Sequence, residues 1–161
     1  LSQFSYCPLI WMIHSRTLNN RINKLHERCL RVVYRDFHSS FEQLLSKNKS
    51  FTIHERNIQN LAIELFKVKM GLAPKFMKEI FTLKDSSRYP SNQIFVTHNV
   101  RSVFHGTNTL SHMGPKIWLI IPDEIKASTT LIIFKRKIRR WKPVNCLCRL
   151  CKIYLDKVGF T

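Results

Sequence analysis

Residues 52–71, TIHERNIQNLAIELFKVKMG, carry the most regular pattern in the chain and indicate its fold class. Thr52 and Glu55 have the spacing of a capping box, which starts a helix, and Gly71 is the residue type that commonly follows a helix end. Between them, apolar residues recur every three or four positions: Ile58, Leu61, Ala62, Leu65, Phe66 and Val68. This period predicts a helix that runs to Lys69 or Met70 and buries one face.

On the N-terminal side of this segment, the sequence predicts three more helices. Residues 4–14 are apolar enough for a short buried helix, and residues 17–34 form a longer amphipathic one. The apolar face of the longer helix is predicted to hold Leu18, Ile22, Leu25, Cys29 and Val32. Ser40 and Gln43 form a second capping box, which predicts a short third helix.

On the C-terminal side, Pro74 predicts the start of a short helix. Residues 109–121 look helical, but Pro115 lacks a backbone N–H, so we expect a break at Gly114–Pro115. Residues 122–125 predict one more turn. Thr130 then caps a last helix, whose apolar stripe is Leu131, Phe134, Ile138 and Trp141.

Together these patterns predict a mainly α protein, a small helical bundle with a short extended or β segment around 94–105 and a cysteine-containing tail. The polar stretch 82–93 is the best boundary. We therefore expect three regions: helical residues 1–81, a linker with the extended segment at 82–108, and a basic helical region at 109–161. Because the sequence begins with Leu1 and not Met, we also expect a fragment of a longer protein.

The charge of the chain points to its partners. The 161 residues include 27 Lys and Arg but only 10 Asp and Glu, which gives a net charge of +17. This imbalance favours a polyanion, above all nucleic acid, although an anionic lipid surface is the alternative. No run of apolar residues is long enough to span a membrane, and we predict no membrane partner.

Two helices carry most of the expected phosphate contacts. The predicted set is Arg21, Lys24, Arg28 and Arg31 in the first, and Lys135, Arg136, Lys137, Arg139, Arg140 and Lys142 in the second. A charged helix face is often only a solvated surface, but here the acids that would neutralise it are few. We expect binding that depends on salt and largely ignores base sequence. Trp141 fits core packing better than base stacking, since it continues the apolar stripe.

The tail contains the one motif with cofactor potential, Cys146, Cys148 and Cys151 in the pattern C-x-C-x-x-C. Thiolates favour a structural zinc, which needs four ligands, and the fourth would be His98, His105, His112 or a residue outside this sequence. The alternative is three free thiols. With five cysteines in all and no signal-peptide pattern, we expect a reduced, intracellular location in the nucleus or cytoplasm.

No catalytic motif is recognisable in the sequence. The nearest acidic pair, Asp123 and Glu124, is better explained by a favourable position at a helix start than by catalysis. A polymerase needs carboxylates that converge on two metal ions, and no such set is evident.

Three segments resemble one family. They are YCPLIW at 6–11 with LHERCLR at 25–31, GPKIW at 114–118 with Ile121–Pro122 and Phe134–Lys135, and CLCRLCK at 146–152. In this order they are similar to the C-terminal end of a non-LTR, LINE or jockey-like retrotransposon reverse transcriptase, the thumb and the region after the palm. The resemblance spans nearly the whole chain.

The resemblance implies an RNA-directed DNA polymerase whose catalytic palm, with its Tyr-Ala-Asp-Asp segment and its Mg²⁺ ions, lies outside this sequence. No catalytic residue can be assigned here, so whether the chain belongs to an enzyme stays open. The implied partners are template RNA, target DNA and the upstream palm of the same polyprotein. The alternatives are a non-enzymatic DNA- or RNA-binding module, a zinc-dependent interaction module, or the product of a decayed element.

The zinc hypothesis gives a first prediction. Native mass spectrometry of the purified chain should detect one zinc per molecule, which a chelator or the substitution Cys146→Ser removes. A chain that carries no zinc before chelation would instead identify Cys146, Cys148 and Cys151 as free thiols.

Overall fold

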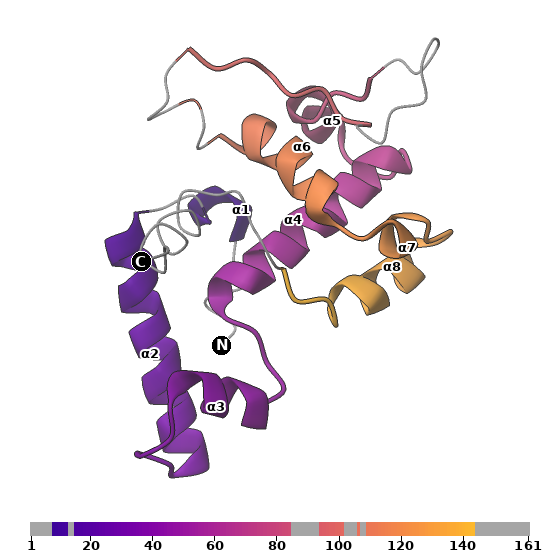
Figure 1. Ribbon diagram of the computed structural model, residues 1–161. Helices are drawn as coiled ribbons and strands as arrows, with labels where there is room; N and C mark the ends of the chain where they lie inside the picture. The colour runs from indigo at the N-terminus through magenta and orange to yellow at the C-terminus, as the bar shows by residue number, and fades with distance from the viewer. Residues whose placement is uncertain (1–7, 13–14, 85–93, 102–105, 107–108, 144–161) are drawn as a thin grey trace, which may run out of the picture. The chain divides into compact units, whose positions relative to one another are not determined.

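The computed structural model describes residues 8–12, 15–84, 94–101, 106 and 109–143 (Figure 1). It confirms the mainly α class. The described helices are α1 (Pro8–Trp11), α2 (Arg16–Tyr34), α3 (Phe41–Lys47), α4 (Ile53–Lys69), α5 (Lys75–Ile80), α6 (Leu110–Ile120), α7 (Asp123–Lys126) and α8 (Leu131–Ile138). The only β pairing among these residues is an isolated antiparallel bridge between Leu83 and Phe95.

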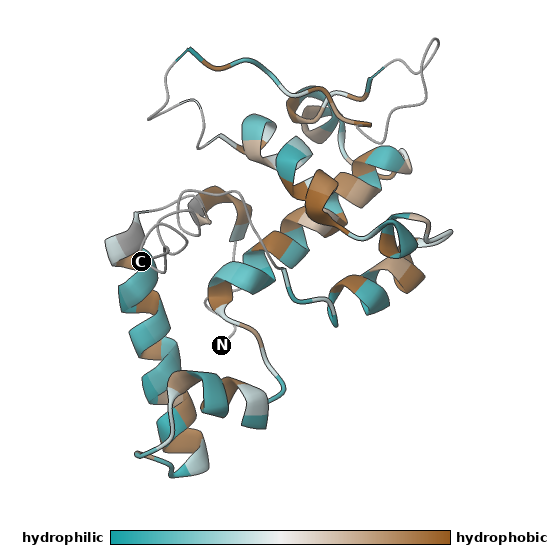
Figure 2. Ribbon diagram, viewed as in Figure 1, coloured by the Kyte–Doolittle hydropathy of each residue, from teal (hydrophilic) through white to brown (hydrophobic). Residues whose placement is uncertain are grey.

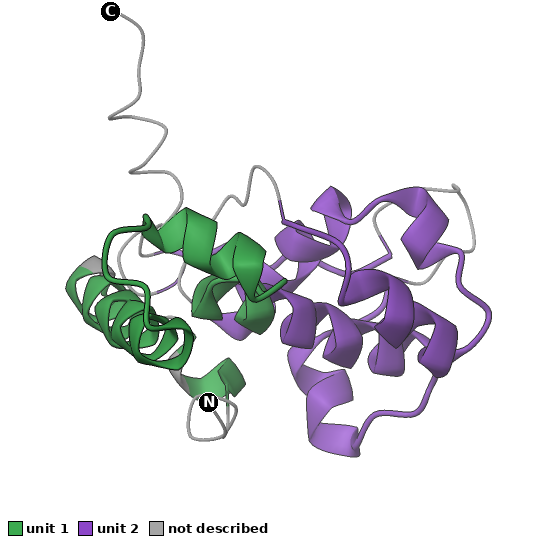
Figure 3. Cartoon of the chain, turned by 90° about the horizontal axis from the view of Figure 1, so that it is seen from below, with its two compact units in different colours: residues 1–57 green, residues 58–161 purple. Residues whose placement is uncertain are grey.

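The chain divides into two compact units, residues 1–57 and residues 58–161 (Figure 3). The division falls within α4, whereas the sequence placed its boundary at 82–93. The three regions expected from the sequence, 1–81, 82–108 and 109–161, remain a prediction.

Unit 1 is built around α2 and α3. Ser15 caps α2 by accepting a hydrogen bond from the Leu18 N–H, and Arg35 ends the helix in the left-handed conformation, with φ of 50°. The predicted capping box of Ser40 and Gln43 is present at the start of α3. Between the helices lies a small apolar core, which consists of Leu30, Leu44 and Leu45 with Tyr34 and Phe41 packed against it.

The prediction of which side of α2 is buried is wrong. Leu18 is 47% exposed, Leu25 49% and Val32 69%. The helix instead buries Asn19, His26 and Leu30, whose spacings of seven and four place them on a neighbouring face. Figure 2 shows apolar and polar residues alternating along α2, so hydropathy alone does not mark the buried side.

Unit 2 is organised by the remainder of α4, whose predicted apolar face is fully confirmed. Ile58, Leu61, Ala62, Leu65, Phe66 and Val68 are all buried. The Phe66 ring stacks on Phe134 of α8, with 4.1 Å between ring centroids, and Trp118 of α6 lies beside Phe134 at 6.3 Å. Phe95, from the bridge segment, meets the Trp118 ring edge-on at 5.4 Å.

The end of α4 also follows the sequence prediction. Gly71 adopts a φ of +73°, a conformation that glycine reaches without strain. The backbone N–H groups of Gly71 and Leu72 then bond to the carbonyl oxygens of Val68 and Lys67, which closes the helix.

Helix α6 does not break at Gly114–Pro115, as the sequence predicted, but continues through both residues. Pro115 gives up one helical hydrogen bond, yet the burial of Met113, Ile117 and Trp118 on the same helix outweighs that loss. Gly114 brings the helix close to its neighbours: a Cβ placed there would lie 2.4 Å from Cε1 of Phe81 and 3.3 Å from Cδ2 of Leu65.

This close approach reverses the usual effect of a glycine-to-alanine change in a helix. Alanine normally stabilises a helix interior by about 1 kcal/mol relative to glycine. Overpacking a core costs about 1–3 kcal/mol, and the approach of 2.4 Å to Phe81 favours the upper part of this range, about 2–3 kcal/mol. For Gly114→Ala we therefore expect a net loss of about 1–2 kcal/mol. Urea denaturation measures the change. Phe81→Leu in the Gly114→Ala background should recover part of the loss, and an unchanged or raised midpoint in Gly114→Ala would contradict the close packing.

Candidate nucleic-acid interface

Helix α8 is held in place by its cap and by its apolar side. The Thr130 hydroxyl accepts a hydrogen bond from the Ile133 N–H at 3.3 Å, as the sequence predicted. Phe134 and Ile138, one turn apart, are fully buried against unit 2. Replacing a buried Phe by Ala costs about 3–5 kcal/mol and replacing a buried Ile about 2–5 kcal/mol. This apolar side of α8 therefore determines which side of the helix faces solvent.

Two polar contacts hold the C-terminal end of α8. The Gln59 side chain on α4 donates a hydrogen bond to the Trp141 carbonyl at 2.8 Å, and Lys137 Nζ donates to the Glu124 carbonyl at 3.0 Å. Helix α8 ends at Ile138, three residues before Trp141, the last residue of its predicted apolar stripe. The Trp141 N–H still bonds to the carbonyl of Lys137, so helical turns continue to that residue.

The side of α8 away from the core is strongly cationic. Arg136, Lys137, Arg139, Arg140 and Lys142 are exposed, and Lys135 is half-buried. Four ion pairs join described residues, and none includes a residue of this set. Arg136 and Arg139 lie on one face with Ile132, which is 74% exposed. We call Ile132, Arg136, Arg139 and Arg140 the α8 face; Ile132 was not predicted, since apolar residues were assigned to the core.

Two other cations of unit 2, Lys69 and Lys126, serve the fold. Lys69 Nζ lies 5.9 Å from the Phe66 ring centroid and 5.8 Å from that of Trp118, and it bonds to the Lys126 carbonyl. Lys126 pairs with Asp123 at 3.1 Å, within the first turn of α7. This pairing agrees with a structural role for the Asp123–Glu124 segment. A count of lysines and arginines therefore overstates the charge that is available to a ligand.

The predicted cations of α2 differ among themselves. Arg21, Lys24 and Arg28 are exposed and take part in none of the four ion pairs. Arg31 instead bonds to Glu27 one turn earlier, at 2.6 Å. This arrangement, with the acid four residues before the base, is the favourable one on a helix. Arg31 is thus the least available of the four.

The buried side of α2 contains an ionisable group that is not available to solvent. His26 is fully buried and meets the Phe41 ring edge-on at 5.6 Å, and neither ring nitrogen has a hydrogen-bond partner among the described residues. Burial lowers the pKa of His26, and the positive charge of Arg56 lowers it further. The ring is therefore neutral at neutral pH and does not add to the cationic surface.

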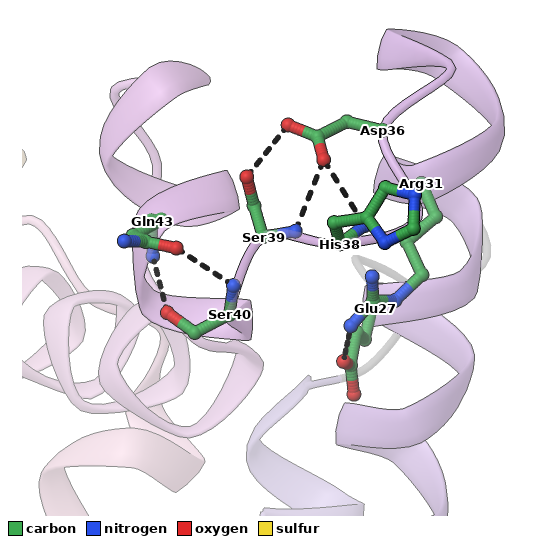
Figure 4. A network of polar contacts seen from close by, with 7 residues as sticks. All are labelled: Glu27, Arg31, Asp36, His38, Ser39, Ser40 and Gln43. Atoms are coloured by element: carbon green, nitrogen blue, oxygen red, sulfur yellow. Dashed lines mark hydrogen bonds and ion pairs between the residues drawn. The ribbon is translucent and has the colours of Figure 1, made fainter.

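The turn between α2 and α3 is organised by Asp36 (Figure 4). Its carboxylate accepts hydrogen bonds from the backbone N–H groups of Ser39 and His38, at 3.0 and 3.3 Å, and from the Ser39 hydroxyl at 2.8 Å. Lys47 Nζ lies 3.5 Å away. The Ser39 hydroxyl and the backbone N–H bonds lower the pKa of Asp36 to about 2, because they favour the charged form.

Four of the predicted zinc ligands lie outside the described residues: Cys146, Cys148, Cys151 and His105. His112 is buried on α6, and its Nδ1 lies 3.3 Å from the His98 carbonyl oxygen. Throughout the described part of the chain, no three His, Cys, Asp or Glu side chains form a group suited to a metal ion.

Comparison with known proteins assigns no family. No family model, curated protein or solved structure matches the chain. Within the described ranges, no helix has both the length and the apolar character needed to cross a membrane.

The Asp36 turn predicts how unit 1 responds to acid. A carboxylate with a lowered pKa stabilises the fold above its unfolded value, 3.8, and this contribution is lost as the pH falls towards 2. Asp36→Asn should lower the melting temperature at pH 7 and flatten its fall between pH 4 and pH 2, measured by circular dichroism. Glu42→Gln, an exposed carboxylate in the same unit, is the control. Equal acid profiles for Asp36→Asn and the native chain would contradict this role.

Proposed function

We propose that this chain binds the phosphate backbone of nucleic acid through the α8 face and the basic residues beside it. One observation carries the proposal: the cations from Lys135 to Lys142 form no ion pair with a described acid, while their helix is fixed by two buried side chains. Because the backbone of the helix is already fixed, only the side chains lose conformational entropy when they meet a polyanion. Arg136, Arg139 and Arg140 are suited to bidentate contact with phosphate oxygens.

The nucleic acid is proposed to be template RNA or target DNA, and the chain to be the C-terminal part of a retrotransposon RNA-directed DNA polymerase. This finer proposal rests on the three segments that resemble that family. In such a protein, the chemistry and its Mg²⁺ ions would belong to an upstream palm. The present chain would hold the nucleic acid, with Arg21, Lys24 and Arg28 of α2 as further contacts to the backbone.

Charge reversal on the α8 face tests the binding proposal. Arg136→Glu, Arg139→Glu and Arg140→Glu together should weaken the binding of a single-stranded RNA by at least tenfold at moderate salt. Each lost phosphate contact reduces the salt slope by roughly 0.7, so we expect the slope of log K against log salt to fall by about 2. Fluorescence anisotropy across a salt series measures both quantities.

The control changes net charge equally at other exposed sites, with Lys49→Glu, Lys75→Glu and Lys78→Glu. If binding depends on the α8 face, the control should lose much less affinity than the α8 variant. Equal losses in the two variants would mean that net charge alone attracts the RNA, and unchanged affinity in the α8 variant would refute the proposal. Circular dichroism confirms that each variant keeps its helices.

A further inference from the structure

The exposed apolar residues of α2 form a continuous stripe. Leu18, Leu25, Cys29 and Val32 are separated by seven, four and three positions, which places them on one face of the helix. All four are exposed, although the helix buries a neighbouring face in unit 1. Single exposed leucines are ordinary, but an aligned row on one helix marks a surface for interaction. We call these residues the α2 stripe.

Cations border the α2 stripe along one edge. Arg21 lies three residues after Leu18 and four before Leu25, while Arg28 lies three after Leu25 and four before Val32. Residues at these separations are neighbours on a helix surface, so both arginines adjoin the stripe. The only acid of α2, Glu27, is two positions from both Leu25 and Cys29, hence on the opposite side, where it bonds to Arg31.

We propose that the α2 stripe docks an amphipathic helix of an acidic protein partner. The partner would place apolar side chains, spaced by three, four and seven residues, against Leu18, Leu25 and Val32. Asp or Glu residues beside them would meet Arg21 and Arg28. Helix docking of this kind derives its affinity from the apolar row, and the charges select the partner and its orientation.

The charges and the burial pattern argue against other occupants. A second copy of this chain would bring together two proteins of net charge +17, each with Arg21 and Arg28 beside its stripe. Binding to a lipid surface scales with the apolar area that enters it. The α2 stripe offers a narrow apolar area, because Asn19, His26 and Leu30 on the adjoining face are buried. Nucleic acid would engage the arginines but would leave Leu25 and Val32 in water.

The inference does not rest on the α8 face, because its affinity comes from the apolar residues of α2. It does assign Arg21 and Arg28 to the acidic partner, so nucleic acid that contacts these two arginines would compete with that partner. The probe is a fluorescein-labelled, designed amphipathic helix with a leucine row bordered by glutamates. A second peptide carries lysine at each glutamate position. We expect the acidic peptide to bind with a Kd of the order of 1–100 µM, typical of a small interface, and the basic peptide to bind at least tenfold more weakly.

Leu25→Ser with Val32→Ser should weaken the acidic peptide by at least tenfold and leave RNA affinity unchanged. The matched control, Leu72→Ser with Phe76→Ser, removes two exposed apolar residues of unit 2 and should bind the peptide as the native chain does. The α8 charge reversal should leave peptide affinity within about twofold, which separates this proposal from the proposed function.

Equal binding of the acidic and basic peptides, or no loss in Leu25→Ser with Val32→Ser, would overturn the inference. Two further assays test the other occupants: flotation with vesicles of phosphatidylserine and phosphatidylcholine, and light scattering of the native chain. Stripe-dependent vesicle binding without peptide binding would replace the protein partner with a lipid surface. A dimer that the two serine substitutions dissociate would replace it with a second copy.

Discussion

The stacked pair of Phe66 and Phe134 is the contact on which unit 2 depends. It joins the most regular helix of the sequence, α4, to the most cationic one, α8, at 4.1 Å between ring centroids. Both rings are fully buried, and Trp118 and Ile138 are buried beside them. Removing Phe134 would leave a cavity next to Phe66 and release the apolar side of α8. The direction of the basic residues is therefore a consequence of aromatic packing on α4.

This packing divides the cations of unit 2 into two classes. Lys69 lies over the faces of Phe66 and Trp118, where it shields the aromatic core and bonds to a backbone carbonyl. Arg136, Arg139 and Arg140 project from the other side of α8 and have no described carboxylate as a partner. Charges that face water attract a polyanion over about 10 Å at 0.1 M salt. The Lys69 ammonium is instead already engaged with two rings and a carbonyl of the fold. The exposed cations that form no described ion pair, and not the total number of Lys and Arg residues, determine which contacts unit 2 can make with a polyanion.

The sequence predicted those elements in which local and long-range forces agree. In α4, the capping residues, the apolar period and Gly71 all favour the same helix, and the structure confirms each. In α8, Thr130, Phe134 and Ile138 likewise take their expected roles. The prediction failed at Gly114–Pro115, because the local signal for a break was overridden by the burial of Trp118 and its neighbours. It failed again on α2, because Asn19 and His26 are buried and no hydropathy pattern assigns polar residues to a core.

The two failures have opposite consequences. At α6, packing overrode a local signal and produced a closer fit, with Phe81 against Gly114. On α2, the polar residues Asn19 and His26 are buried, whereas Leu25 and Val32 are exposed to water, which is unfavourable for apolar side chains. Leu25 is 49% exposed and Val32 69%, so full burial would add only part of the roughly 1.5–3 kcal/mol that a fully exposed side chain gains, and the described fold does not use this part. The buried imidazole of His26, neutral and without a hydrogen-bond partner among the described residues, adds to that cost. A helix that buries histidine and exposes leucine leaves an apolar row unused, and this is the physical basis for proposing a protein partner for the α2 stripe and a polyanion for the α8 face.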